Sequence, residues 1–153
     1  SGLTGIGGGM ANMALGKPVL FEGCVSGPSA PVNMTDGNWH TSAGSCETVG
    51  ASSATAATID LGAQYFVAAS VRLSLFSQTG TIRDIYLRCS DDGLVWGVCG
   101  ANDQLAPPVI GETYMYTFGG NAFARYLQVF VSAASGYPND QISVHELKAV
   151  RLE

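Results

Sequence analysis

Four cysteines, Cys24, Cys46, Cys89 and Cys99, carry the most distinctive side-chain chemistry of this sequence. No two of them have the C-x-x-C spacing of zinc sites and thioredoxin-like redox motifs. An even number of cysteines favours disulfides formed in an oxidising compartment, whereas the alternative is four buried thiols in a reducing one. We therefore expect a secreted or cell-surface protein with two disulfides.

Four cysteines allow three disulfide pairings, and the local sequence favours one of them. An Asp-Gly turn signal that begins at Asp92 lies between Cys89 and Cys99, and β-prone residues flank it on both sides. A hairpin at this turn brings the two cysteines close together across its strands. We therefore predict the disulfides Cys89–Cys99 and Cys24–Cys46.

Side chains that could carry out catalysis are scarce. The chain has two histidines, His40 and His145, and it has no G-x-S-x-G nucleophile motif. No pairing of a nucleophile with a base is visible, and the acidic residues fall mostly in turn-like segments rather than in pairs suited to glycoside hydrolysis. We expect a protein that is not an enzyme.

Composition narrows the class of partner. With 153 residues the chain suits one domain, and its 46% hydrophobic residues exclude a disordered chain. Charged residues make up 12% and the net charge is -5, which argues against binding to nucleic acid or to anionic lipid. No apolar run approaches the roughly 20 residues that span a bilayer. Neither nucleic acid nor membrane lipid is therefore an expected partner.

Strands dominate the predicted secondary structure. Alternating or β-prone runs occur at residues 65–76, 82–89, 113–118, 125–131 and 142–150, with Gly, Pro, Asn and Asp between them. This spacing is typical of an antiparallel β-sandwich or jelly roll. Outward residues of these strands, such as Arg72, Ser74 and Arg88, are short or charged, so we expect no cleft on the sandwich faces.

The last predicted strand contains a break in its alternation. Ile142 and Val144 share one face, whereas Leu147 and Ala149 share the opposite parity. All four can face the core only if one extra residue is inserted near His145, which is what a β-bulge does. Otherwise Leu147 faces outward. We predict the bulge, and because bulges re-aim side chains and carbonyls, we predict a ligand position there.

Two segments lack a strand pattern. Residues 1–10 are rich in glycine and are expected to form a linker or N-terminal extension, which leaves residues 11–153 as the domain. Residues 48–58 are small side chains, for which we expect a surface loop that could pack closely against a neighbouring subunit.

Six short segments follow one another in the order found in a known family. They are N-M-A-L-G-K-P at 12–18, M-T-D-G-N at 34–38, T-I-D-L-G at 58–62, S-D-D-G-L-V-W at 90–96, A-R-Y-L-Q-V at 124–129 and I-S-V-H-E-L at 142–147. Together they resemble the discoidin family, the coagulation-factor type C domains. This resemblance implies an all-β, antiparallel jelly-roll β-sandwich of the galactose-binding-like type, with ligand loops clustered at one end.

The resemblance also implies a structural Ca²⁺ site. Lectin-like and carbohydrate-binding branches of the family hold this ion between the D-G-N loop and the glutamate of the last strand. Carried over by position, the ligands are the carboxylates of Asp36 and Glu146, the backbone carbonyls of Asn33, Asn38 and His145, and the carbonyl and hydroxyl of Ser45. Such a mixed oxygen shell suits Ca²⁺. The alternative is a plain Asx turn at Asp36 and a solvated Glu146.

Two branches of the family suggest where a sugar would bind. Arg83 corresponds to one of the two arginines of the fucose-binding lectins. Tyr137 lies in the loop from which family-32 carbohydrate-binding modules stack an aromatic ring on a sugar, although it could equally anchor that loop to the sandwich. Trp39, His40 and Phe76 are further loop aromatics or hydrogen-bond donors. Aromatic stacking beside a few polar groups is typical of sugar sites.

Two classes of function follow from these observations. The leading hypothesis is a non-catalytic extracellular module that binds glycans or a cell-surface glycoprotein, or that mediates cell adhesion. The second is a structural module that packs against neighbouring protein subunits, which the low charge and the small-residue tract favour, because small side chains lose little entropy on packing.

Overall fold

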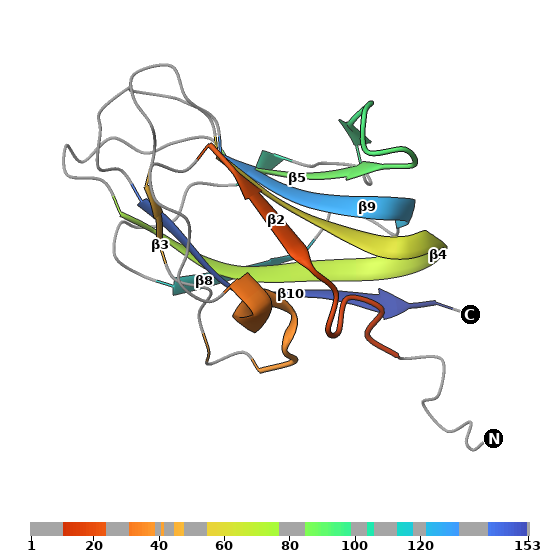
Figure 1. Ribbon diagram of the computed structural model, residues 1–153, viewed down its shortest axis with the longest axis horizontal. Coiled ribbons are helices and arrows are strands. Elements are labelled where there is room, and N and C mark those ends of the chain that lie inside the picture. Colours follow the sequence, from red (N-terminus) through yellow and green to blue (C-terminus); the bar gives the residue numbers. More distant parts are fainter. Residues whose placement is uncertain are drawn as a thin grey trace.

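The computed structural model describes residues 11–23, 31–38, 41, 45–47, 55–76, 85–98, 104–105, 113–117, 122–131 and 141–152. Its elements are the strands β2 (Val19–Glu22), β3 (Ser45–Glu47), β4 (Thr55–Phe76), β5 (Ile85–Ser90), β6 (Gly97–Val98), β7 (Gln104–Leu105), β8 (Thr113–Thr117), β9 (Ala122–Val131) and β10 (Gln141–Arg151), and the 3-10 helix η2 (Pro31–Thr35). The described part of the chain is thus almost entirely β (Figure 1), as predicted. The predicted linker at residues 1–10 lies outside the described residues.

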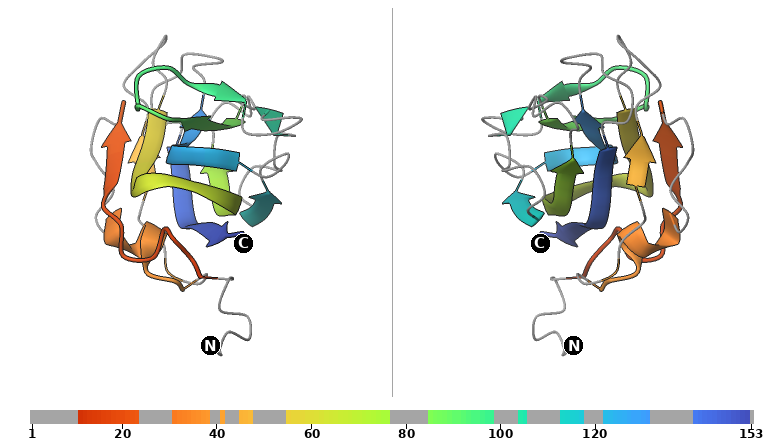
Figure 2. Two further views of the ribbon diagram at one scale, coloured as in Figure 1. Left: turned by 90° about the vertical axis from the view of Figure 1, so that its right-hand side faces the viewer. Right: turned by 90° about the vertical axis from the view of Figure 1, so that its left-hand side faces the viewer.

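All the strand pairs among the described residues are antiparallel. The main order is β3-β10-β4-β9-β5-β6, while β2 and β8 pair with β4, and β7 pairs with β5. The sheet folds over on itself, so that its halves enclose one core (Figure 2). β4 belongs to both halves, because its first part pairs with β2 and its last part with β8 and β10. The change occurs at a register shift between Asp60 and Tyr65, where Gly62 has a positive φ of 90°.

Alternating residues of the strands build the core. It contains Ile59, Leu61, Val67, Val71 and Leu73 of β4, Leu87 of β5, Leu127 and Val129 of β9, and Val144, Leu147 and Ala149 of β10. The alternation predicted from the sequence is therefore confirmed in these four strands. Truncating one buried leucine to alanine typically costs about 2–5 kcal/mol.

One sequence expectation is wrong. The small-residue tract 48–58 was expected to be a loop, but residues 55–58 form the start of β4, and Ala57 is buried. Small side chains suit this position, because β4 runs there between β2 and β9 and pairs with both. Residues 48–54 lie outside the described part of the chain.

The predicted β-bulge in the last strand is confirmed. The register of β10 against β4 shifts between Val144 and Glu146, which leaves His145 as the extra residue. Val144, Leu147 and Ala149 consequently all face the core and are buried. The side chain of Ile142 lies outside the described set.

The predicted hairpin between β5 and β6 is also confirmed, with Cys89 paired in register with Gly97. The Asp92 carboxylate accepts backbone N–H bonds from Leu94 and Val95 at 2.8 and 3.0 Å, which closes the turn. Gly93 has a positive φ of 77°, and a Cβ there would lie 3.4 Å from the ring of Tyr126. Glycine therefore suits both the turn and its packing.

Cys89 is disulfide-bonded, and its partner lies outside the described side chains. Cys24 and Cys99 lie outside the described residues, and of Cys46 only the backbone, in β3, is described. The pairings Cys89–Cys99 and Cys24–Cys46 therefore stay predictions.

Candidate functional site

The segment of η2 and Asp36-Gly37-Asn38 is held against the N-terminal turn of the domain. Thr35 donates its hydroxyl to the carbonyl of Lys17 at 2.7 Å, and the N–H of Gly16 donates to the carbonyl of Thr35 at 2.7 Å. Met34, fully buried, anchors the helix in the core. These contacts fix the position of the Asp36 loop relative to the sheet.

The same loop contacts the bulge of β10. The Gly37 N–H donates to Glu146 Oε2 at 2.9 Å, and the Glu146 side chain is 0% exposed. Gly37 has a φ of 82°, and a Cβ there would lie 3.0 Å from Leu15 Cδ1, so the position requires glycine. The D-G-N segment thus brings Asp36 to the buried glutamate, as the family resemblance implied.

Asp36 is held by its own loop. Its Oδ1 accepts the N–H of Asn38 at 2.8 Å, and its Oδ2 accepts the hydroxyl of Thr41 at 2.6 Å. These two hydrogen bonds are the largest causes that hold the pKa of Asp36 below its usual value. Asp36 therefore stays ionised beside Glu146.

Glu146 is in the opposite electrostatic situation. Burial is the largest cause that raises the pKa of Glu146, to about 8, and its contact with the Asp36 carboxyl raises it further, while the Gly37 N–H opposes the shift. Two carboxyl groups in contact resist double ionisation unless a positive charge neutralises them. The alternative interpretation is thus wrong for Glu146, which is buried rather than solvated, whereas the Asx turn at Asp36 is present, as its bond from the Asn38 N–H shows.

The donor set fits a hard cation such as Ca²⁺. Glu146 Oε1 is buried and has no hydrogen-bond partner among the described residues, so one carboxylate oxygen is left for another ligand. Beyond Asp36 and Glu146, no third acidic, histidine or cysteine side chain of the described ranges completes a cluster. Backbone carbonyls and hydroxyls would have to supply the other oxygens, which Ca²⁺ accepts.

The structure describes the remaining predicted metal ligands in differing detail. Asn33 lies in η2, and the Asn38 carbonyl accepts the Thr41 hydroxyl at 3.1 Å. His145 is the bulge residue, which has no register partner on β4. Ser45 pairs in register with Ser143, two residues before the bulge, and its side chain is not among those described.

The raised pKa of Glu146 should be detectable in the pH dependence of folding stability when no metal is bound. The folded state keeps a proton up to a pKa of about 8 that the unfolded chain releases near 4.5, so this residue makes the folded state less stable as pH rises between these values. The melting temperature of Glu146→Gln minus that of the wild type, measured in chelator, should therefore increase from about pH 5 to pH 8.

Subtracting the wild type cancels the other titrating groups, such as His145, whose pKa is lowered and acts in the opposite direction. Gln64→Ala, which alters an exposed residue of β4 that does not ionise, provides the control and should show a flat difference. A flat difference for Glu146→Gln as well would contradict the assignment of a buried, proton-holding glutamate.

Most of the predicted sugar-binding residues lie outside the described part of the chain: Trp39, His40, Arg83 and Tyr137. Phe76 is the last residue of β4, and its side chain is not described. Phe76 pairs with Gln141, and Val131 pairs with Ile85. The strand ends that flank the segments of Arg83 and Tyr137 thus meet at one end of the sandwich (Figure 1).

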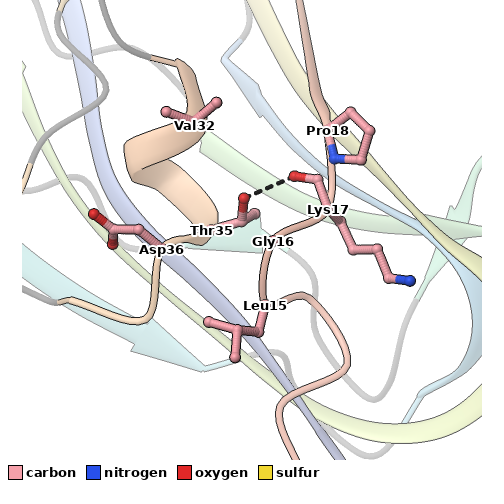
Figure 3. A pocket seen from close by; sticks show the side chains of 7 residues that line it. All are labelled: Leu15, Gly16, Lys17, Pro18, Val32, Thr35 and Asp36. Atoms are coloured by element: carbon pink, nitrogen blue, oxygen red, sulfur yellow. Dashed lines mark hydrogen bonds between the residues drawn. The ribbon is translucent and has the colours of Figure 1, made fainter.

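A hollow of about 500 Å³ beside Asp36 was not anticipated from the sequence (Figure 3). Its lining residues are Leu15, Gly16, Lys17, Pro18, Val32, Thr35 and Asp36. Leu15 is 56% exposed and Val32 is 70% exposed, and the side chains of Lys17 and Asp36 point away from each other. The hollow forms where the turn at residues 12–18 meets η2, which no local sequence pattern reports.

Comparisons with known proteins agree with this architecture. No family model and no curated protein matches the sequence. Solved structures do match. A chitosan-binding module 2 in complex with chitotriose, from a chitosanase/glucanase of Paenibacillus sp. IK-5, has a TM-score of 0.58 and 16% identity over 90% of this chain and 98% of its own.

Two further structures are similar to the same extent. A Streptococcus pneumoniae fucose binding module has a TM-score of 0.54 and 20% identity over 94% of this chain and 96% of its own. The Clostridium perfringens module CpGH89CBM32-5, in complex with GalNAc-beta-1,3-galactose, has a TM-score of 0.56 and 15% identity over 91% of this chain and 99% of its own. The predicted fold is confirmed: the chain has the galactose-binding-like β-sandwich of such modules, consistent with a discoidin-like domain.

Proposed function

We propose that this chain is a non-catalytic extracellular module that binds glycans and is stabilised by a structural Ca²⁺. The observation that carries the proposal is its similarity, over more than nine-tenths of its length, to a fucose binding module and to a module in complex with GalNAc-beta-1,3-galactose. Its partner would be a glycan or a cell-surface glycoprotein, and its function would include adhesion. No helix among the described residues has the length and apolar character needed to cross a membrane.

The metal would have a positioning role in this proposal. Asp36 and Glu146 would supply the carboxylates, and the carbonyls of Asn33, Asn38 and His145 with Ser45 would supply neutral oxygens. A divalent cation would neutralise the two carboxylates and so join the Asp36 loop to β10. This chain's own residues would then hold the loop that continues into Trp39 and His40 in one conformation.

The sugar would bind at the loop end that carries Phe76, Arg83 and Tyr137. Proline at position 138 biases Tyr137 towards an extended backbone, which helps to hold its ring in one place and reduces the entropy lost on binding. Arg83 would donate hydrogen bonds to sugar hydroxyls beside the ring.

Tyr137→Ala should weaken glycan binding at least tenfold, or about 1.4 kcal/mol, without changing the melting temperature. Ligands identified on a glycan array can be titrated calorimetrically against this variant. Phe123→Ala is the matched control, because it removes an exposed aromatic ring from β9, away from Tyr137 in the sequence, and should bind normally. Normal binding by Tyr137→Ala would remove the main residue of the proposed site.

A structural module that packs against neighbouring subunits is the second candidate. The observation that favours it is the exposed apolar tip of the β5–β6 turn, where Leu94 is 82% and Val95 is 75% exposed. Exposed apolar residues that lie together can mark protein contacts. A concentration-dependent oligomer on a sizing column, together with a blank glycan array, would favour this function over glycan binding.

A further inference from the structure

The outer side of the half-sheet β2-β4-β9-β5 carries a row of outward-facing residues. Leu20 pairs with Thr58, Thr58 with Gln128, and Gln128 with Arg88, so the row crosses all four strands. Its inward neighbours, such as Leu87 and Leu127, are buried in the core. Three strand spacings make the row about 14 Å long. We call it the outer-face row.

A hollow lies at the β2 end of the outer-face row. It has a volume of about 380 Å³ and is lined by Pro18, Val19, Leu20, Thr58, Asp60 and Tyr126. The sequence-based expectation that the sandwich faces offer no cleft is therefore wrong. The hollow is formed by residues of three neighbouring strands, β2, β4 and β9, together with Pro18. The volume falls within the roughly 300–1,000 Å³ of ligand pockets.

The Arg88 guanidinium lies at the β5 end of the row, stacked on aromatic rings. Its Cζ is 3.8 Å from the centroid of the Phe130 ring and 5.5 Å from that of Tyr86. No acidic side chain of the described ranges pairs with Arg88. A guanidinium that lies over a ring keeps its N–H groups free along its edge, and this edge matches a planar carboxylate.

Gln128 lies between the hollow and Arg88 and is incompletely hydrogen-bonded. It is 6% exposed, and its Nε2 donates to Thr58 Oγ1 at 3.1 Å. Its Oε1 is buried and has no partner within the described part of the chain. Exchanging the amide nitrogen and oxygen would leave the other polar atom unpaired instead. Buried polar groups without partners are rare, so this one indicates a place where a ligand group would complete the network.

We infer that the outer-face row binds a short acidic oligosaccharide that contains uronic acid. One carboxylate would pair with the edge of Arg88, and a sugar ring would lie in the hollow against Tyr126. A hydroxyl between them would reach the amide of Gln128 by displacing the side chains that cover it. Along the row lie, in order, a hollow, an amide and a stacked arginine. This order matches a chain of sugar rings that carry hydroxyls and a carboxylate.

The charge of the chain disfavours densely charged anions. The chain has 7 basic residues against 12 acidic ones, so a polyphosphate would meet repulsion over most of the surface. A single arginine with an aromatic backing suits a ligand that carries its carboxylates one to a sugar ring, because one of them can pair with the guanidinium. This inference keeps the glycan class of the proposed function but places the acidic sugar on the sheet face rather than at the loop end.

The test titrates trigalacturonate and its trimethyl ester against the wild type and single variants. The ester keeps the shape and hydroxyls but removes the charge. We expect the acid to bind at least tenfold more tightly than the ester, and Arg88→Gln to lose at least tenfold affinity for the acid. Arg151→Gln is the matched control, since Arg151 also stacks on a ring, Tyr65 at 5.2 Å, and it should change affinity by less than twofold.

The position of the binding site is measured in the wild-type protein, without the variants. Amide chemical-shift changes in the wild type on adding trigalacturonate should centre on Leu20, Thr58, Gln128 and Arg88, which keeps the inference testable even if Arg88→Gln folds poorly. Shifts elsewhere, or equal binding of acid and ester, would overturn it. Triglutamate that binds as tightly as trigalacturonate would overturn the assignment of a sugar ligand.

The two proposed sites can fail separately. If Tyr137→Ala abolishes binding of trigalacturonate, the acid binds at the loop end and the outer-face inference is wrong. If Tyr137→Ala leaves a neutral array ligand bound but Arg88→Gln releases the acid, the loop-end proposal fails and the outer-face site stands.

Discussion

Ca²⁺ should raise the melting temperature of this domain, and Asp36→Ala should abolish the increase. A ligand at 100-fold excess over its Kd that binds only the folded state adds about 2.7 kcal/mol, which for a domain of this size corresponds to roughly 5–10 °C. The physical reason is the pair of carboxylates. The ionised Asp36 lies against the buried Glu146, whose pKa is raised to about 8, and a divalent cation would relieve that conflict.

Asp91→Ala is the matched control for this prediction, because Asp91 is an exposed carboxylate in the β5–β6 turn, away from β10. It should keep the full response to Ca²⁺. Scanning calorimetry in excess Ca²⁺ and in excess chelator measures both variants against the wild type. Superimposable wild-type melts in the two conditions would remove the metal from this site.

Much of the sandwich could be predicted because its signals are local. The alternation of core residues in β4, β9 and β10, on either side of their irregular points, follows from the two-residue period of a strand that buries one face. The bulge at His145 was predictable for the same reason, since Val144 and Leu147 cannot both face inward without an inserted residue. The Asp-Gly turns were also predictable from the sequence, because Gly37 and Gly93 adopt the positive φ that glycine allows.

Features that depend on distant contacts were not predictable from local sequence. No residue near Glu146 in the sequence indicates that its side chain is fully buried. The loop that contacts it, through the hydrogen bond from Gly37, lies more than 100 positions earlier in the chain. The family resemblance, rather than a local sequence pattern, predicted that the Asp36 loop and Glu146 lie together. Residues 55–58 were expected in a loop because small side chains carry little alternation, and the pairing of β2 and β9 with them decided the outcome.

Surfaces were the hardest to predict. Tyr126 and Leu20 meet around one hollow from strands that are separated by a hundred residues, and the stacking of Arg88 on Phe130 needs the register of β5 against β9. A residue's type indicates that it can bind, but its neighbours across the strands decide what it binds. This is why the arginine expected to be a plain outward charge becomes part of a candidate site.

Inserting one alanine between Glu146 and Leu147 should have a larger effect than any single side-chain substitution in β10. With one more residue after the bulge, the strand beyond it changes parity, so Leu147 and Ala149 would turn outward and Lys148 would turn towards the core. Losing one buried leucine alone costs about 2–5 kcal/mol, and burying a lysine adds to that cost. We expect a loss of at least about 4 kcal/mol in the free energy of unfolding, or no cooperative folding.

Deleting His145 is the matched control, because Glu146 already pairs with Arg72 and Leu147 with Val71, so β10 without its bulge residue keeps its parity and should lose much less stability. His145→Ala separates the inserted backbone from the imidazole, because it keeps the bulge, and the Nδ1 of this ring has no hydrogen-bond partner among the described residues. Its urea denaturation should lie within about 1 kcal/mol of the wild type. If the insertion variant instead unfolds at nearly the wild-type urea concentration, β10 can absorb a second extra residue, and the argument that strand parity keeps Leu147 in the core would have to be abandoned.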